Sequence, residues 1–497
     1  MNNPIFHVIL VSLYPVIWLY STNLHQALFT DILIPVLIMT PLSLLIMLIL
    51  NKFTKNIKLS AVSVSTSIIV VFSYGPFKNL LKSDYLVSFL LILILFLLIF
   101  YFKKNSVQLN RINRFFNLLA VFLFILPLFS IIQYGVFSKN ISNDYRADLK
   151  IWNTKPSYSV QYPDIYYFIF DRYASAKTLK EVFDFDNSEF TKFLTSTGFF
   201  VAEDSWANYY STGHSLASSL NMVYLDDLIA TVRKTDRDWK KLYQLITDHQ
   251  VGKNLKSLGY KYYHFGSWWW PTSKNKMANF NVNLGLLSEF STVLLCNSLF
   301  YPLASQFNPP IVDSRYTQWR RINYQFAKLA EIPQKKEATF VFAHFIIPHE
   351  PYIFEANGNF LTSVLAGQRN PKGQYVDQIK FLNSRMQSLI NGILINEKNS
   401  IIILQSDEGP YPESYEKNKN QFDWTRAASS EIRQKMSILN AIYLPKADYS
   451  GLNKDFSPVN TFRVVFNNYL GAKLELLPNR YFLGNMSYPY NLFEVNK

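Results

Sequence analysis

The sequence predicts an α/β domain with a mostly parallel central sheet, covered by helices on both faces and preceded by α-helical membrane spans. Two observations carry this fold class. The first 137 of the 497 residues are strongly apolar, and after Tyr162 apolar β-rich runs alternate with helical patterns. A third observation concerns function, because two of the β-rich runs stop on carboxylates, at Asp171 and Asp407.

The membrane region contains five stretches that approach the roughly 20 apolar residues a spanning helix needs. The third is the weakest, being rich in Ser and Thr. Five such stretches in series predict a multi-pass membrane protein with a membrane domain over residues 1–137. The stretches cover residues 5–20, 32–50, 59–77, 86–102 and 116–137.

The basic residues of the short loops predict the orientation. Lys and Arg concentrate in the loops at 52–58 and 103–114, whereas the loop at 21–31 has none. Basic loops remain on the cytoplasmic side. We therefore expect a cytoplasmic N-terminus in a bacterial-type cytoplasmic (inner) membrane and a large periplasmic or extracellular C-terminal domain. The first stretch lacks a basic start and a cleavage site, so we interpret it as a retained helix.

Charge and cysteine content exclude several classes of function. The net charge of +14 is spread along the chain, which favours contact with a membrane surface or an anionic substrate over nucleic-acid binding. Cys296 is the only cysteine, so an intramolecular disulfide and a cysteine-based zinc site are both excluded.

The remaining sequence divides into a polar linker at 138–161 and an extracytoplasmic domain at 162–497. Apolar β-rich runs predict strands, and longer periodic segments predict helices. The expected strands are 165–170, 260–265, 339–344, 401–405 and 439–443, and the expected helices are 188–197, 215–222, 238–257, 316–330 and 375–396.

Asp171 and Asp407 each follow a buried-strand pattern. The carboxyl ends of parallel strands meet at one edge of a sheet, so the two acids can share a site although they are distant in sequence. A carboxylate at the edge of a core is costly unless it is paired or binds a cation. Arg172 is the alternative partner for Asp171, and Asp is also common after strands because it suits turns.

A hydroxyl-rich turn containing Thr212 precedes the expected helix 215–222. Backbone N–H groups at a helix start favour a phosphate or a developing anion. Threonine is a poor nucleophile unless a metal or a base activates it. Ser211 and Ser215 compete for the role, and hydroxyls at a helix start also serve as caps.

Two histidines and a tryptophan cluster are further candidates. His344 and His349 follow the expected strand 339–344, where an imidazole can donate to a phosphate or act as acid or base. Residues 268–270 are three tryptophans after another expected strand. This cluster suits an apolar chain or a sugar, and equally a core or a membrane interface.

Together these residues resemble the alkaline phosphatase/sulfatase superfamily, and within it the membrane-anchored branch of lipoteichoic acid synthases and phosphoethanolamine transferases. The resemblance covers residues 163–478, and five helices before an outer domain match the synthase layout. The Cys/Ser-x-Pro-x-Arg signature of true sulfatases is missing around Thr212. The motifs that carry the resemblance to the superfamily are the strand ending at Asp171, residues 208–222, 266–269 and 405–410, Pro348-His349, and residues 457–463.

The resemblance implies an alkaline-phosphatase-like domain in which Asp171, Thr212 and Asp407 bind a metal, with Thr212 as the nucleophile. It also implies substrate contacts. The residues expected to make them are His349, His344, Asn208 and Trp269.

One departure concerns the metal. The family usually has Asp-His-Gly where this chain has Asp407-Glu408-Gly409. If Glu408 is the fourth ligand, the site for one divalent metal ion contains only oxygen, which favours Mn or Mg over Zn. The alternative is that Glu408 turns away from the metal.

The expected function is therefore a metal-dependent transferase. It would move a substituted phosphoryl group, of the phosphoethanolamine or phosphoglycerol type, from a lipid phosphodiester donor to a cell-envelope glycan or lipid through a phospho-threonine. One alternative is a phosphodiesterase or other sulfatase-like hydrolase. The other is a catalytically degenerate protein that binds an envelope glycan.

Overall fold

The computed structural model forms two compact units, and one of them is built from two separate parts of the chain. One unit comprises Met1–Asn143 and Leu286–Ser314, and the other comprises Asp144–Gly285 and Arg315–Lys497. The predicted linker at 138–161 lies, apart from Ser138, outside the described residues. The structure describes residues 3–138, 162–285, 287–302, 314–334, 337–396, 399–419, 421–446, 449 and 451–497.

The first unit is helical, and within its described residues five segments are long and apolar enough to cross a membrane. This confirms the predicted series of spans. The third segment consists of two helices, α3 and α4, that meet at Ser73. The helices are α1 (Pro4–Thr22), α2 (Leu33–Thr54), α3 (Ile57–Phe72), α4 (Tyr74–Leu81), α5 (Asp84–Lys104) and α6 (Leu109–Ser138).

A short helix from the second half of the chain, α14 (Glu289–Cys296), belongs to the helical unit. Its Phe290 and Leu294 pack in one apolar cluster with Leu19 at the end of α1. The N–H of Leu299 donates to the carbonyl of Val71 near the end of α3, at 2.9 Å. These are the helix ends that the basic loops assign to the outer side. The sequence had placed this segment within the outer domain.

The second unit contains a seven-stranded sheet in the order β2-β7-β6-β1-β5-β3-β4. Strands β4, β3, β5, β1 and β6 are parallel, whereas β7 runs antiparallel to β6 and β2 antiparallel to β7. The strands are β1 (Asp164–Asp171), β2 (Phe200–Val201), β3 (Lys261–Phe265), β4 (Phe280–Val282), β5 (Thr339–Pro348), β6 (Ser400–Ser406) and β7 (Asn440–Tyr443).

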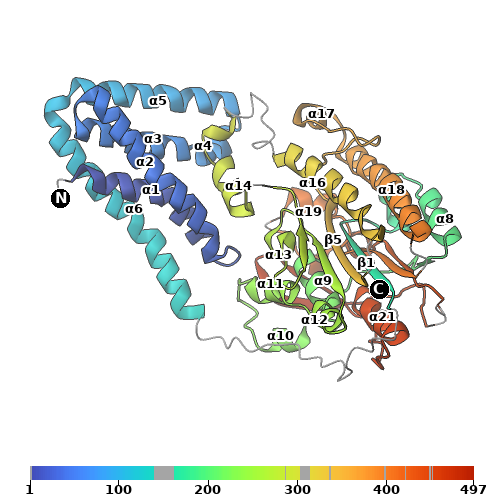
Figure 1. Cartoon of the computed structure of the whole chain (residues 1–497). Coiled ribbons are helices and arrows are strands. Elements are labelled where there is room, and N and C mark those ends of the chain that lie inside the picture. The colour runs from blue at the N-terminus through green and yellow to red at the C-terminus, as the bar shows by residue number, and fades with distance from the viewer. Residues whose placement is uncertain are drawn as a thin grey trace. The chain divides into compact units, whose positions relative to one another are not determined.

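Strand β1 is central because its side chains are apolar on both faces. Tyr167 belongs to one core cluster and Phe168 to the other, as the two-residue period of a strand requires. Helices therefore cover both faces of the sheet, as predicted (Figure 1). One face carries α9 (Thr212–Ser219), α11 (Lys240–Thr247), α12 (Gln250–Ser257) and α21 (Thr461–Tyr469), and the other α7 (Ala176–Phe183), α8 (Ser188–Ser196), α16 (Ser314–Leu329) and α18 (Pro371–Asn396).

The remaining elements are short, and one predicted helix is divided. The helix expected at 238–257 is interrupted at Asp248, and His249 caps the second part by accepting from the N–H of Gly252. Helix α9 begins at Thr212, three residues earlier than expected. The short elements are α10 (Asp226–Ala230), α13 (Trp270–Ser273), α17 (Ser363–Gln368), α19 (Glu413–Lys417), α20 (Ser429–Met436), β8 (Tyr481–Asn485) and β9 (Tyr488–Val495).

Candidate metal centre

The register of three parallel strands places three polar side chains on one face of the sheet. Ile169 on β1 pairs with His344 on β5 and with Gln405 on β6. Paired residues of neighbouring strands point to the same face, and so do residues two apart in one strand. Asp171, His344 and Asp407 therefore project from the same edge and face, the one covered by α9.

These three residues form a compact group. One ligand atom from each lies within 4.8 Å of the others, and all three residues are buried. Asp171 Oδ1, His344 Nε2 and Asp407 Oδ2 are also buried atoms with no hydrogen-bond partner among the described residues. Buried polar atoms normally have partners, so three unpaired atoms aimed at one point fit a divalent metal.

The charges of the two aspartates also favour a bound cation. Burial and the neighbouring Asp407 raise the pKa of Asp171 well above its ordinary value. Burial and the nearby Glu408 raise the pKa of Asp407 to about 7. Two buried carboxylates this close cannot both ionise without a counter-charge. Arg172 Nε, which lies 3.9 Å from Asp171 Oδ1, supplies part of that charge, and a bound divalent ion would supply the rest.

Asp407 and His344 are oriented by their remaining atoms. Asp407 Oδ1 accepts from the backbone N–H groups of Arg172 and Glu408, at 3.3 and 2.8 Å, which leaves Oδ2 for the centre. His344 Nδ1 lies 2.8 Å from Thr272 Oγ1. A proton on Nδ1 leaves the lone pair of Nε2 directed at the centre. Burial lowers the pKa of His344 to about 3, which keeps the imidazole neutral, as a metal ligand must be.

Thr212 is the hydroxyl residue that faces this group. It is half-buried at the start of α9, and its side chain lies close enough to Asp407 to lower the pKa of that carboxyl. The competing hydroxyls are engaged elsewhere. Ser211 Oγ lies 2.7 Å from His214 Nδ1, and Ser215 Oγ donates to the carbonyl of Tyr209 at 3.0 Å.

The structure does not bring Glu408 into the metal group, in contrast to the sequence-based expectation. Arg172 Nε lies 3.0 Å from Glu408 Oε1, and Lys435 Nζ lies 3.1 Å from Oε2. The Lys435 side chain is fully buried. Glu408 therefore acts as the counter-ion of two cations, and its charge also raises the pKa of both aspartates. The nitrogen of His344 also means that the group is not an oxygen-only site.

Gly409 allows this arrangement. A Cβ at Gly409 would lie 2.4 Å from the carbonyl oxygen of Gln434, so only glycine permits the end of α20 to approach so closely. The N–H of Gly409 donates to the carbonyl of Lys435 at 2.8 Å. The ring of Tyr411 then contacts both cations, with Lys435 Nζ at 3.3 Å and the Arg172 guanidinium at 4.6 Å from its centroid.

The other predicted site residues have different roles. Trp269 packs edge-on against His344, with 6.1 Å between ring centroids, so it contacts one residue of the group. His349 is half-buried after β5, and burial together with Arg172 lowers its pKa well below the ordinary value. Asn208 is not part of the group. Its amide donates to the carbonyl of Arg480 at 3.0 Å and accepts from the N–H of Val459 at 2.9 Å, so it stabilises loops.

Sequence reasoning missed Lys435 and Thr272. Lys435 belongs to a polar helix, where lysine is ordinarily on the surface. Thr272 follows the tryptophan cluster, and no sequence signal marks it. Both side chains are fully buried beside charged or metal-binding groups, which only the tertiary structure reveals.

Comparisons with known proteins give matches at the level of structure only. No family model matches the chain, and no curated protein matches it. The periplasmic domain of EptC from Escherichia coli matches with a TM-score of 0.42 at 12% identity, covering 68% of this chain and 94% of that one. The same domain has also been solved in complex with Zn, and it matches with a TM-score of 0.40.

Two further solved structures are similar. An alkaline phosphatase superfamily protein from Vibrio parahaemolyticus matches with a TM-score of 0.41 at 9% identity, over 69% of this chain and 79% of that one. The periplasmic domain of the phosphoethanolamine transferase EptC from Campylobacter jejuni matches with a TM-score of 0.36 at 9% identity, over 64% of this chain and 92% of that one. The matched structures include a protein of the superfamily that the sequence motifs resemble.

Proposed function

We propose that this chain is a membrane-bound, metal-dependent transferase that moves a substituted phosphoryl group from a lipid phosphodiester to a cell-envelope glycan or lipid. The observation that carries the proposal is the convergence of Thr212 with the unpaired atoms of Asp171, His344 and Asp407. A hydroxyl beside two buried carboxylates and a neutral imidazole is suited to metal-assisted nucleophilic chemistry.

Thr212 is the proposed nucleophile. Its side chain lies beside Asp407 and lowers the pKa of that carboxyl, as a hydroxyl that can donate to a carboxylate does. Donation to Asp407 would give the Thr212 proton an acceptor and leave a lone pair on the oxygen free. Thr212 forms a bond to phosphorus as the lipid alcohol leaves with a proton. The acceptor hydroxyl then displaces Thr212, which regains its proton.

The start of α9 and two cations would bind the phosphate of the substrate. No acceptor among the described residues takes the backbone N–H groups of Thr212 and Gly213, at the first turn of α9. Such N–H groups favour an anion at this position. Arg172 and Lys435 are held beside the centre by Glu408, and they add positive charge for the phosphoryl oxygens. This compensation for Glu408 supports a working site over a degenerate one.

A divalent metal would be held by Asp171, His344, Asp407 and Thr212. When bound, it supplies Lewis-acid stabilisation of the phosphoryl charge and lowers the pKa of a coordinated hydroxyl. Because one ligand is an imidazole, the oxygen-only argument for Mn or Mg over Zn no longer applies, and we propose a transition-metal ion such as Mn or Zn.

The experiment that tests this function is intact-mass analysis of the full-length chain in detergent after incubation with lipid extracts. We expect a mass increase equal to a substituted phosphoryl group. It should be lost in Thr212→Val, which keeps the shape but removes the hydroxyl, and retained in the control Ser211→Ala. If the adduct is lost in Ser211→Ala and retained in Thr212→Val, the assignment of Thr212 is refuted.

Addition of an acceptor glycan separates transfer from hydrolysis. Transfer to the glycan supports the proposed transferase. Release of the phosphoryl group to water at an unchanged rate with and without acceptor would favour the phosphodiesterase alternative. A chain that never carries an adduct and binds no metal would be the degenerate binding protein.

A further inference from the structure

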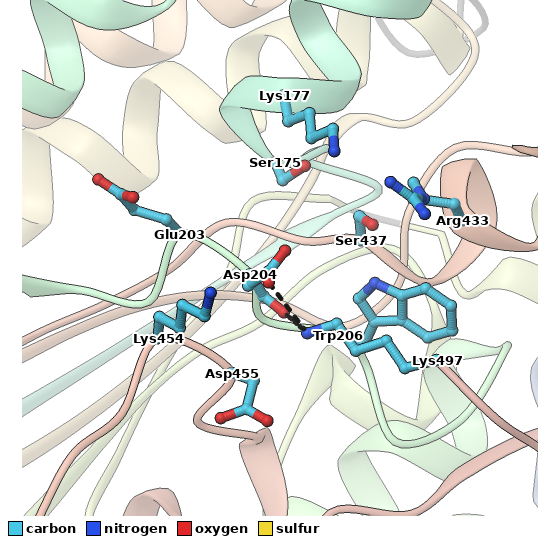
Figure 2. A pocket seen from close by; sticks show the side chains of 10 residues that line it. All are labelled: Ser175, Lys177, Glu203, Asp204, Trp206, Arg433, Ser437, Lys454, Asp455 and Lys497. Carbon is cyan, nitrogen blue, oxygen red and sulfur yellow. Dashed lines mark hydrogen bonds and ion pairs between the residues drawn. The ribbon is translucent and has the colours of Figure 1, made fainter.

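A polar cavity of about 390 Å³ opens in the α/β unit and includes none of the metal-centre residues in its lining (Figure 2). Its lining is almost entirely charged or hydroxylated. The buried part consists of Ser175, Trp206 and Ser437, which are 5%, 5% and 6% exposed. Lys177, Arg433 and Lys454 line its exposed part.

The buried part of the cavity is held by backbone contacts. The N–H of Ser175 donates to the carbonyl of Ser437 at 3.3 Å, and Trp206 forms an antiparallel bridge with Ser437. Next to this bridge, the N–H of Ala207 donates to the carbonyl of Met436 at 2.7 Å. The positions of the three buried residues are therefore fixed before any ligand enters, which lowers the entropic cost of binding.

Several hydrogen-bond donors converge in this cavity. Among the described residues, no acceptor contacts the indole N–H of Trp206 or the hydroxyl of Ser437. Figure 2 shows the indole nitrogen directed towards Ser437 and Arg433, and the charged ends of Lys177 and Arg433 directed towards each other. Lys177 has only a 4.0 Å pair with Glu181, both side chains being more than half exposed, and Arg433 has no carboxylate within 4.0 Å among the described residues.

Two cationic ends directed into the same part of a cavity favour an anion there. A guanidinium, an ammonium, a hydroxyl and an indole N–H together form donors on several sides of one point, which suits a tetrahedral oxyanion. The opposite side carries acids. Asp204 pairs with Lys497 at 3.8 Å, and Asp455 is half-buried without a cation within 4.0 Å in the described part of the chain.

We propose that this cavity is a second phosphate-binding site, which takes a phosphate ester whose substituent carries a hydroxyl or ammonium group. The phosphate binds the donors around Arg433 and Trp206, and the substituent donates to Asp455. The cavity exceeds the size of phosphate alone, so a substituent of modest size fits. The lining offers no apolar wall beyond Trp206, which favours a glycan-borne or soluble phosphate ester over an acyl chain.

The cavity also shares chain segments with the metal centre. Ser175 is four residues after Asp171, Trp206 is six residues before Thr212, and Ser437 is two residues after Lys435. A ligand in the cavity would therefore contact chain segments that also carry Asp171, Thr212 and Lys435. Resting on the proposed function, we assign the site to the phosphate of the acceptor substrate.

The test is phosphate binding by the full-length chain in detergent after its metal has been removed with a chelator. Isothermal titration with inorganic phosphate and with glycerol phosphate should show saturable binding. Trp206→Phe, which keeps the ring and removes the N–H, and Arg433→Gln should each weaken it about tenfold, as the loss of a hydrogen bond to an anion predicts. The control Lys192→Gln removes an exposed charge on α8 outside the cavity and should change binding by less than about twofold.

Equal weakening by Lys192→Gln would overturn the inference, because it would indicate general charge attraction. So would binding that neither cavity variant weakens. Binding of phosphatidylglycerol in mixed micelles without binding of either soluble phosphate would also overturn it. Phosphate binding needs no Thr212 adduct, so failure of this site and failure of the proposed transferase are distinguished by the two assays.

Discussion

The variant Glu408→Gln tests whether Glu408 is a counter-ion of Arg172 and Lys435 or a metal ligand. In the structure, Glu408 lies 3.0 Å from Arg172 Nε and 3.1 Å from Lys435 Nζ, and its side chain is 3% exposed. The substitution keeps the shape and removes the charge. It leaves two cations beside the metal centre without their shared carboxylate.

The expected loss of stability follows from this burial. Removing one partner of a buried ion pair costs about 3–5 kcal/mol, because the other charge remains uncompensated. Burial lowers the pKa of Lys435 to about 8 even with Glu408 present. Without Glu408, Lys435 loses its proton near neutral pH, which limits the cost to about 3 kcal/mol. For a unit of this size, that lowers the Tm by roughly 6 °C.

The assay is thermal unfolding of the metal-loaded chain in detergent, with metal affinity measured in parallel. The control is Glu413→Gln, which removes an exposed partner of Lys417 at 2.7 Å and should change the Tm by less than about 2 °C. Glu408→Gln should bind metal with nearly unchanged affinity. An unchanged Tm together with lost metal binding would refute the counter-ion role and restore Glu408 as a ligand.

Three further predictions test other parts of the structure. Thr272→Val should lower metal affinity about 10- to 100-fold because it no longer fixes the ring of His344, whereas Thr272→Ser should retain it, as measured by competition with a chelating dye. Burial lowers the pKa of His249 to about 3 and that of His264 to about 4, both from 6.5. At a pH between the folded-state pKa and 6.5, the unfolded chain therefore binds more protons than the folded chain. Unfolding free energy should therefore fall as the pH drops below 6.5, by about 2 kcal/mol per histidine at pH 5, and a Tm that is constant from pH 7 to 5 would contradict this. Protease added to intact spheroplasts should remove the 162–497 domain, and protection until lysis would overturn the orientation that the basic loops predict.

The sequence was sufficient to predict the architecture because each signal was local. The apolar runs at β1 and β6 and the spacing of the five spans depend only on neighbouring residues. The position of Asp171 and Asp407 at one edge followed from a general property of parallel sheets. The division between α11 and α12 was missed because both halves have the same helical period, and only the capping contact of His249 separates them.

The site was only partly predictable because its chemistry depends on contacts between distant segments. His344 joins the two aspartates through the pairing of β5 with β1, which single-sequence reasoning does not provide. The sequence predicts Glu408 at the metal because it takes the position of the histidine in the Asp-His-Gly pattern of the resembled family. Its actual partner, Lys435, is brought close by the approach of α20 to Gly409.

The measurement that tests the central claim most directly is metal content per chain, determined by mass spectrometry on the purified full-length protein. One divalent ion per chain is expected in the unmutated protein and in Glu408→Gln, with strong loss in His344→Ala, since His344 and not Glu408 belongs to the buried group. Retention of the ion in His344→Ala and its loss in Glu408→Gln, or no ion in the unmutated chain, would contradict the account.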